Sequence, residues 1–143
     1  MHLTRYTDFA LRTLIHLAVH DERLCSIAEI ASANGISQNH LMKVASDLSR
    51  AGYVAAVRGR SGGLRLARAP EAINVGEVVR HTEEGFQLAD CAHCVIAPAC
   101  GLSHVLDEAL AAFLNILDGY TLADLLTKRR ALRRILGGER SPA

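Results

Sequence analysis

The chain has 143 residues, of which 50% are hydrophobic and 22% are charged. This composition supplies one hydrophobic core and excludes a disordered chain. No apolar run approaches the roughly 18 residues that a membrane helix needs, and the first residues lack the apolar core of a signal peptide. We therefore expect a cytoplasmic protein of one domain's size, without a membrane partner, in a compartment where disulfides are rare.

The formal net charge of +1 hides an uneven distribution along the chain. Residues 37–70 contain six basic residues and one acid, whereas residues 74–124 contain one basic residue and eight acids. Residues 125–143 return to six basic residues and one acid. A basic segment of this size is typical of a surface that binds a polyanion. Runs of charge more often mark a solvated helix face than a binding surface. The structural motifs predicted within residues 37–70 therefore have to distinguish the two.

Helical periodicity begins near the N-terminus. Residues 7–20 carry apolar side chains around more than half of a helix circumference, and Thr7 is the predicted N-cap. Ser26 and Glu29 have the spacing of a capping box, which predicts a short helix through Ala33.

A turn and another helix follow directly. Asn34 and Gly35 tolerate the left-handed conformation of a tight turn, and Ser37 is expected to cap a helix that ends near Gly52. Residues 26–51 therefore predict a helix-turn-helix, the motif that places its second helix in the DNA major groove. The first residues of that helix face the base edges, and here they can all donate or accept hydrogen bonds: Gln38, Asn39, His40 and Lys43.

A β-hairpin is predicted in the position of a wing. Residues 53–57 and 64–67 have strand character, and a glycine-rich turn joins them. Arg58 and Arg60 lie in this turn, where glycines let the backbone approach phosphates and an arginine can enter a narrow minor groove. Because the basic charge coincides with the motif and its hairpin, we predict that this region binds double-stranded operator DNA.

The second half of the chain predicts helices around a loop. A helix is expected near residues 75–82, and residues 85–101 show no periodicity. Residues 102–118 then carry apolar side chains at spacings of 4-3-4-3, with a second apolar stripe beside them. A helix of this apolar girth needs burial on two sides, so we expect it to form a homodimer interface.

The predicted architecture is therefore mainly α, a winged helix-turn-helix domain with a long C-terminal dimerisation helix. Residues 1–84 form the DNA-binding domain, with the helix-turn-helix at about 26–51 and the wing at about 53–68. Residues 85–101 form a ligand-binding loop, residues 102–136 form the dimerisation helices, and residues 137–143 form a disordered tail. Thr121 is expected to cap a last, basic helix within the dimerisation segment.

Three of the four cysteines lie within ten residues, at Cys91, Cys94 and Cys100. The spacing C-x2-C-x5-C, in a segment with Pro98, predicts a loop in which three thiolates can converge on a metal. Iron–sulfur clusters and zinc sites usually take four ligands, so a fourth must come from elsewhere. The nearby candidates are Asp90, His93 and His104, and another segment or subunit can also supply the fourth ligand. Cys25 is remote and is predicted to be a small, half-buried apolar residue.

The combination of motifs resembles the cytoplasmic iron–sulfur repressors of the Rrf2 family, over about residues 1–136. The resemblance rests on the segments MHLTRYTDFALR, ISQNHLMKV, LSRAGYV and VRGRSGGLRL, and on a cysteine loop that ends in PAC. Within the family the chain is most similar to the nitric-oxide-sensitive repressors, through NHLMK and DGYTLADL. The loop departs from the family pattern because only two residues separate its first two cysteines.

The resemblance implies a homodimer in which an iron–sulfur cluster is held by the three loop cysteines and by an aspartate of the partner subunit. The position that matches this aspartate is Asp8. We expect [4Fe–4S] rather than [2Fe–2S]. Nitric oxide would attack the cluster iron and release the protein from DNA.

The sequence is also compatible with other functions. Family members that sense iron or cluster supply use a histidine shortly after the third cysteine, and His104 lies close to that place but one residue late. A zinc-stabilised interaction module and a redox enzyme that uses Cys91 and Cys94 are the alternatives from other classes. The enzyme is disfavoured because no βαβ pattern precedes the cysteine pair.

Overall fold

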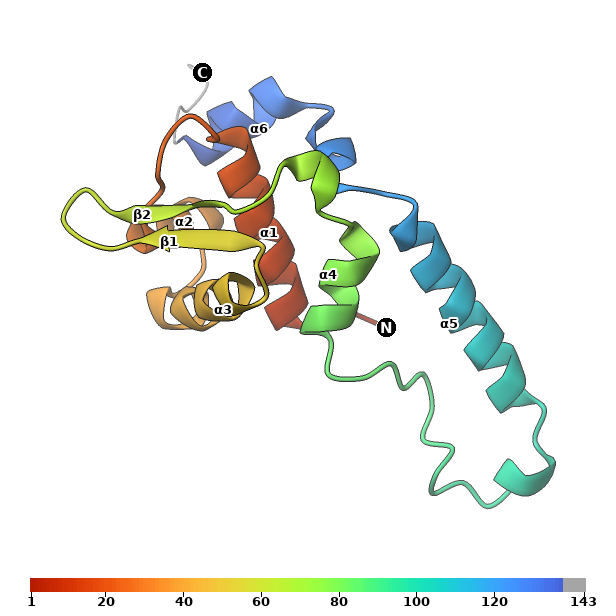
Figure 1. The fold of residues 1–143 in the computed structure, drawn as a ribbon. Coiled ribbons are helices and arrows are strands. Elements are labelled where there is room, and N and C mark those ends of the chain that lie inside the picture. Colours follow the sequence, from red (N-terminus) through yellow and green to blue (C-terminus); the bar gives the residue numbers. More distant parts are fainter. Residues whose placement is uncertain (138–143) are drawn as a thin grey trace, which may run out of the picture.

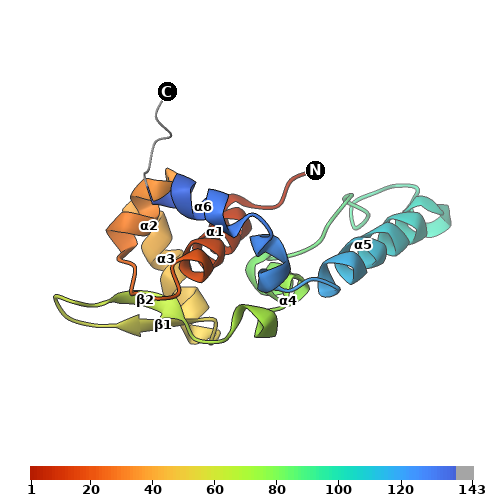
Figure 2. The ribbon, with the colours of Figure 1, turned by 90° about the horizontal axis from the view of Figure 1, so that it is seen from above.

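A computed structural model describes residues 1–137 (Figures 1 and 2). The helices and strands, in chain order, are α1 (Arg5–Val19), α2 (Ile27–Asn34), α3 (Gln38–Arg50), β1 (Val54–Val57), β2 (Gly63–Leu66), α4 (Val75–Thr82), α5 (Leu102–Asp118) and α6 (Arg129–Leu136). Three 3-10 turns lie between them: η1 (Pro70–Ala72), η2 (Ala97–Ala99) and η3 (Leu122–Leu126). The mainly helical architecture with one small hairpin confirms the predicted fold class.

Helix α1 lies at the centre of the body. Elements α2, α3, α4, β2, η3 and α6 all pack against it. Its buried apolar side chains are at most 2% exposed: Ala10, Leu14, Leu17, Ala18 and Val19. Burial of apolar surface is the dominant favourable term in folding, so this helix organises the hydrophobic core.

Two predicted helix caps differ from the structure. Thr4, not Thr7, caps α1, and its side-chain oxygen accepts a hydrogen bond from the Thr7 N–H at 3.3 Å. Thr7 is fully buried inside the helix. Ser26 does cap α2, since its hydroxyl accepts from the Glu29 N–H at 3.1 Å. The Glu29 carboxylate pairs with Arg23 instead of returning to Ser26, so only half of the predicted capping box forms.

The helix-turn-helix forms as expected. Helix α2 ends at Gly35, whose φ of 64° is left-handed, and Ser37 caps α3 by accepting from the His40 N–H at 3.3 Å. One face of α3 is buried in the common core through Leu41, Val44, Ala45 and Leu48. The opposite face and the N-terminal end of α3 are exposed.

The hairpin is attached to the body by a third extended segment. Strands β1 and β2 pair antiparallel, with Val54 opposite Leu66. Cys25 then pairs with β2, because its N–H donates to the Leu64 carbonyl at 3.0 Å and its carbonyl accepts from the Leu64 N–H at 2.7 Å. Cys25 is completely buried rather than half-buried, and this burial raises the pKa of its thiol to about 11.

Helix α5 projects from the body on the side opposite the hairpin (Figures 1 and 2). It packs on α4, and none of its residues is buried. Asp118 fixes its C-terminal end, because its carboxylate pairs with both terminal nitrogens of the Arg80 guanidinium and its carbonyl accepts from the Asn74 amide at 2.7 Å. A Cβ at Gly76 would overlap the Asp118 carboxylate, so a larger residue there would displace this side chain from its position.

The chain after α5 returns to the body. The Leu122 N–H donates to the Ile73 carbonyl at 2.8 Å, and the Leu122 side chain is 1% exposed within the core. Helix α6 lies on α1 and α2, where Arg129 pairs with Asp21 at 2.7 Å. Within the predicted dimerisation segment 102–136, only α5 therefore projects from the body, and the residues after it pack on the body.

Two further expectations concern the C-terminal region. The predicted cap of the basic helix differs from the structure, and most of the predicted tail lies outside the described residues. Thr121 begins the 3-10 turn η3, with a complete capping box to Asp124, rather than capping the basic helix directly. The basic helix α6 follows only at Arg129. The tail predicted over 137–143 lies outside the described residues, except for Gly137.

Replacement of Gly63 should separate the hairpin from Cys25. A Cβ at Gly63 would lie 2.8 Å from the Cys25 carbonyl oxygen, a backbone atom that is held by Leu64. We expect Gly63→Ala to lower the free energy of unfolding by about 1–3 kcal/mol, measured by denaturant titration. The control is Gly85→Ala, whose Cβ would meet nothing within 4 Å and should cost less than about 0.5 kcal/mol. Equal effects of the two substitutions would contradict the close contact.

Candidate functional site

The residues predicted to contact DNA lie on exposed parts of α3 and the hairpin. Gln38, Asn39 and His40 form the first turn of α3, Lys43 follows one turn later, and all four are exposed. Arg58 and Arg60 are exposed in the turn between β1 and β2, which extends from the body beside α2 and α3 (Figure 1). The structure thus groups the four α3 residues and places the two arginines at the far end of the hairpin.

Most of the basic side chains in this region are free to meet phosphates. Within the described residues, Lys43, Arg58, Arg60 and Arg65 form no ion pair. Arg68 instead stacks over the Tyr53 ring, with its guanidinium carbon 4.5 Å from the ring centroid. A surface of unpaired cations around an exposed helix N-terminus is suited to a nucleic-acid backbone.

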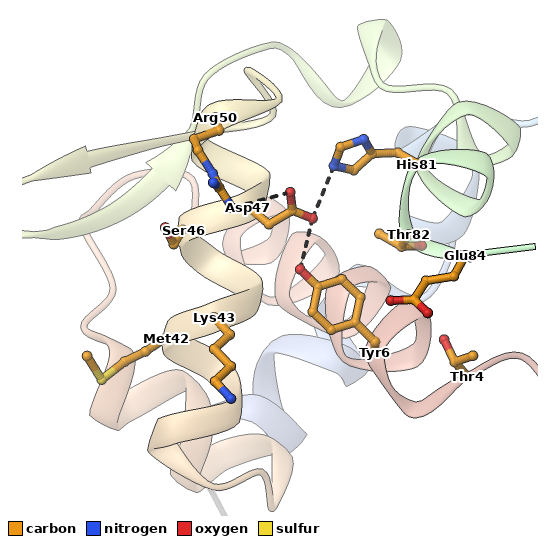
Figure 3. A pocket seen from close by; sticks show the side chains of 10 residues that line it. All are labelled: Thr4, Tyr6, Met42, Lys43, Ser46, Asp47, Arg50, His81, Thr82 and Glu84. Atoms are coloured by element: carbon orange, nitrogen blue, oxygen red, sulfur yellow. Dashed lines mark hydrogen bonds and ion pairs between the residues drawn. The ribbon is translucent and has the colours of Figure 1, made fainter.

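Asp47, on the inner side of α3, connects this helix to two others (Figure 3). The Tyr6 hydroxyl of α1 donates to Asp47 Oδ2 at 2.8 Å, and Nε2 of His81 on α4 lies 3.1 Å from the same oxygen. Lys43 and Arg50 line the same open cavity of about 780 Å³. Burial and the bond to Asp47 raise the pKa of Tyr6 to about 12.

The sequence reasoning did not identify this connection. Tyr6 and His81 lie 41 and 34 residues from Asp47, and no local pattern predicts such pairs. One signal was available, because Asp47 is the only acid among residues 37–70. A single carboxylate in a basic helix indicates a specific partner, and here Asp47 has three: Tyr6, His81 and, at 3.9 Å, Arg50.

The cysteine loop has turns in place of regular structure. The Cys94 N–H donates to the Cys91 carbonyl at 3.4 Å, and the Cys100 N–H donates to the Ala97 carbonyl at 3.3 Å. All three cysteines are free thiols, with Cys94 exposed and Cys91 and Cys100 partly exposed. The Leu102 N–H at the start of α5 donates to Cys100 Sγ at 3.4 Å.

The chemistry of this donor set fits an iron–sulfur cluster. Cluster thiolates bind different iron atoms and stand apart by the width of the cluster, whereas ligands of a single ion must surround one point. Within residues 85–101, no three ligand atoms lie within 4.8 Å of one another, so the loop does not form a preassembled single-ion site. The one such group in the described chain lies elsewhere, in the core.

All the candidate fourth ligands except His104 have other partners within the described part of the subunit. Asp8 Oδ2 accepts from Arg12 Nε at 3.1 Å and from Arg12 Nη2 at 2.6 Å, and the carboxylate is half exposed. Asp8 Oδ1 accepts no hydrogen bond from the described residues. His93 Nδ1 lies 2.9 Å from Asp90 Oδ1, and His104 is exposed on the first turns of α5. Asp8 makes no ion pair or hydrogen bond with residues 85–101 of its own subunit.

The fold and the exposed basic surface define a winged-helix DNA-binding protein. The sequence profile of the Rrf2 family, described as iron-dependent transcriptional regulators, matches residues 3–128. The chain belongs to this family. It is therefore a DNA-binding transcriptional regulator and not an enzyme.

Similar proteins and structures agree with this assignment. The chain is 50% identical to the HTH-type transcriptional regulator NsrR of Bacillus licheniformis, over 95% of this chain and 99% of that protein. It is also 50% identical to NsrR of Bacillus subtilis, over 95% and 97%. The structure of T. potens IscR has a TM-score of 0.75 at 25% identity, over 100% of this chain and 94% of that one. The structure of CymR, the global cysteine regulator of B. subtilis, has a TM-score of 0.69 at 27% identity, over 90% and 98%.

The described helices include none that is both long and apolar enough to cross a bilayer.

The bond between Tyr6 and Asp47 should contribute to stability in a pH-dependent way. Tyr6→Phe removes it and should lower the free energy of unfolding by about 1 kcal/mol at neutral pH. The Tyr6 pKa rises from 10.0 to about 12 in the fold, so the unfolded chain loses the phenol proton first as the pH increases. Stability should therefore fall between pH 10.0 and about 12, measured by urea titration.

The loss of stability above pH 10.0 should be smaller in Tyr6→Phe. Tyr120→Phe is the control, because Tyr120 is 49% exposed and its substitution should leave the decrease in place. The same alkaline decrease in Tyr6→Phe as in the unmodified protein would show that Tyr6 is not its source.

Proposed function

We propose that the protein is a homodimeric repressor whose binding to operator DNA is controlled by nitric oxide through an iron–sulfur cluster in the cysteine loop. The observation that carries the proposal is the placement of three free thiols in a loop that leads directly into α5, a helix with no buried residue. The resemblance to NsrR supports the choice of signal. A cytoplasmic location suits thiols that must stay reduced.

The exposed face of α5 supports the homodimer. Leu102, Val105 and Ile116 are 56%, 57% and 64% exposed, although α4 already covers another side of the helix. Leu106 and Phe113, which belong to the same predicted seam, line cavities shared with Phe86. A second copy of α5 would remove this apolar surface from water, and a two-fold axis lets each helix cover the other.

Cys91, Cys94 and Cys100 would hold the cluster, with Asp8 of the partner subunit as the fourth ligand. When bound, the cluster supplies iron that reacts with nitric oxide. The free Oδ1 of Asp8 supports its role, since the carboxylate can keep its pair with Arg12 and still offer one oxygen. We propose [4Fe–4S] rather than [2Fe–2S].

The subunit itself connects the loop to the DNA-binding surface. Helix α5 is fixed to α4 by Asp118 and Arg80, and the next residue of α4, His81, contacts Asp47 on α3. A change in the loop that moves α5 therefore acts on the helix that supports α3. In a dimer, the separation of the two α3 helices must match the spacing of two operator half-sites, so this connection supplies a route for release.

Substitution of the loop cysteines tests the cluster. Cys91→Ser, Cys94→Ser and Cys100→Ser should each abolish or severely reduce bound iron and sulfide after anaerobic purification, and with it tight operator binding. Asp8→Ala should retain part of the cluster, with an altered spectrum and an altered response to nitric oxide, because a carboxylate oxygen is one of four ligands. His104→Ala should change little.

Three outcomes of these measurements would overturn parts of the proposal. Loss of the cluster in His104→Ala but not in Asp8→Ala would move the fourth ligand and favour sensing of iron or cluster supply. Colourless protein with stoichiometric zinc in the loop would favour a zinc-stabilised module. Full operator binding and unchanged metal content in all three cysteine variants would exclude the loop as the sensor.

Lys43→Ala and Arg60→Ala test the DNA-binding surface. If these side chains neutralise phosphates, each substitution should weaken operator binding and lower the slope of log affinity against log salt by roughly one, measured by fluorescence anisotropy. Lys128→Ala is a control that removes the same charge from an exposed position after η3. A slope that falls equally in all three variants would indicate a general charge effect, and unchanged slopes for Lys43 and Arg60 would exclude both contacts.

A further inference from the structure

We infer that the core contains a second metal site, formed by His16, His20 and Cys25, that takes a single Zn²⁺ ion or a similar borderline-soft divalent ion. This site is separate from the cysteine loop and does not depend on the proposed cluster. It lies between α1 and the segment that leads into α2.

The three side chains bring suitable donor atoms together. One ring nitrogen of each histidine and the Cys25 Sγ all lie within 4.8 Å of one another. His16 and His20 are four residues apart on α1, which places them on one face of the helix. Donors around a tetrahedral zinc ion are about 3.5 Å apart, given Zn–N and Zn–S bonds of about 2.0–2.3 Å, so no two of the three atoms have to approach by more than about 1.3 Å.

One of these donors is buried without a partner. His16 is 0% exposed, and its Nε2 has no hydrogen-bond partner among the described residues. Buried polar atoms are nearly always paired, and an orphan requires an explanation such as a missing ion. His20 and Cys25 are 4% and 0% exposed, so all three ligands of the site would be shielded from water.

The surrounding hydrogen bonds orient both imidazoles. His20 Nδ1 lies 3.0 Å from the His16 carbonyl oxygen, which can only accept, so Nδ1 carries the proton and Nε2 carries the lone pair. His16 Nδ1 lies 3.3 Å from Asn34 Nδ2, an amide nitrogen that can only donate and that also donates to the Ile30 carbonyl at 2.9 Å. Without an ion, His16 Nδ1 therefore accepts and Nε2 carries the ring proton. Metal-bound histidines donate from their second nitrogen, as His20 does. An ion at His16 Nε2 requires the ring proton to move to Nδ1 and the Asn34 side chain to turn its oxygen toward that proton.

Glu29 is the candidate fourth ligand of the site. Glu29 Oε1 lies 4.0 Å from His16 Nε2 and can complete a four-coordinate site, as can a water molecule. Arg23, which is paired with Glu29, also lies 3.6 Å from Cys25 Sγ. His20 borders an open cavity of about 400 Å³ between the α1–α2 connection and α6, whose lining also includes Glu22 and four arginines.

The donor set selects the class of ion. Two imidazoles and a thiolate suit zinc and related transition metals, whereas Mg²⁺ and Ca²⁺ require mostly oxygen ligands. Binding forms a bond between Cys25 Sγ and the metal and releases the thiol proton to water, with no change of oxidation state. Affinity should therefore increase with pH.

Because of the position of Cys25, an ion in this site would link separate parts of the DNA-binding unit. Its backbone pairs with Leu64 of β2, and the residue precedes the Ser26 cap of α2. An ion held by His16, His20 and Cys25 would therefore join α1 to the base of the wing and to the start of the helix-turn-helix. Zinc should stabilise the DNA-binding unit whether or not the loop carries a cluster.

The test uses untagged, full-length protein in which Cys91, Cys94 and Cys100 are all replaced by serine. This background variant has no loop thiols, so its metal content reports on the buried site alone. We expect it to bind one Zn²⁺ per chain in competition with a chromophoric chelator, and Co²⁺ to give a thiolate-to-metal charge-transfer band. Addition of Cys25→Ala should abolish the band and the stoichiometric binding, and addition of His2→Gln, at an exposed position, should change neither.

A folding defect is separated from loss of a ligand by circular dichroism and by a second variant, His20→Gln. Zn²⁺ should raise the unfolding temperature of the background variant but not that of folded variants without Cys25 or His20. The proposal is overturned if the background variant binds no Zn²⁺, or if binding persists unchanged after Cys25→Ala or His20→Gln. Both results are independent of the proposed cluster, whose thiols are absent throughout.

Discussion

The structure depends on the burial of α1, which is the element that the rest of the body shares. Helices α2, α3, α4 and α6, strand β2 and the turn η3 all pack on it, so residues from both ends of the chain meet in one core. Leu122, near the C-terminal end, is as buried as the residues of α1 itself. A regulator built in this way cannot move its DNA-binding helix without a response from α1.

The contacts around Asp47 show how that response can be specific. Most of α3 is held by apolar contacts, which are non-directional, whereas Asp47 is held by Tyr6 from α1 and His81 from α4. Directional bonds define one orientation of α3 and resist others. The helix that would contact DNA is therefore aligned by α1, the central helix, and by α4, which precedes the cysteine loop and packs on α5.

Much of the DNA-binding unit could be predicted because its determinants are local. Gly35 must be left-handed where the turn is tight, and Ser37 caps the helix three residues before His40. The capping box at Ser26 failed in part because Arg23, a nearby charge, competes successfully for Glu29. The position of residues 122–136 against α1 was not predicted, because burial of Leu122 depends on a partner more than a hundred residues earlier.

The candidate sites also differ in whether the sequence could predict them. The three loop cysteines are close in sequence, so their spacing alone indicated a ligand-binding loop. The group in the core was not found, although its three residues span only ten positions, because no sequence pattern shows that the segment after α1 turns Cys25 back toward the two histidines. Asp47 likewise acquires its partners from distant elements, and sequence patterns of short range contain no information about such pairs.

The attachment of α5 at only one end has a mechanical consequence. The helix has 17 residues, and at 1.5 Å per residue it is a rod of about 25 Å. Asp118 holds one end to Arg80 and Asn74, and the cysteine loop lies at the other. A tilt of about 5° at the clamp would displace the loop end by about 2 Å over this length. The converse also holds, because a force at the loop acts on α4 with the full length of the rod as its lever arm, so a small chemical event at the tip can exert a large torque on the helix beside α3.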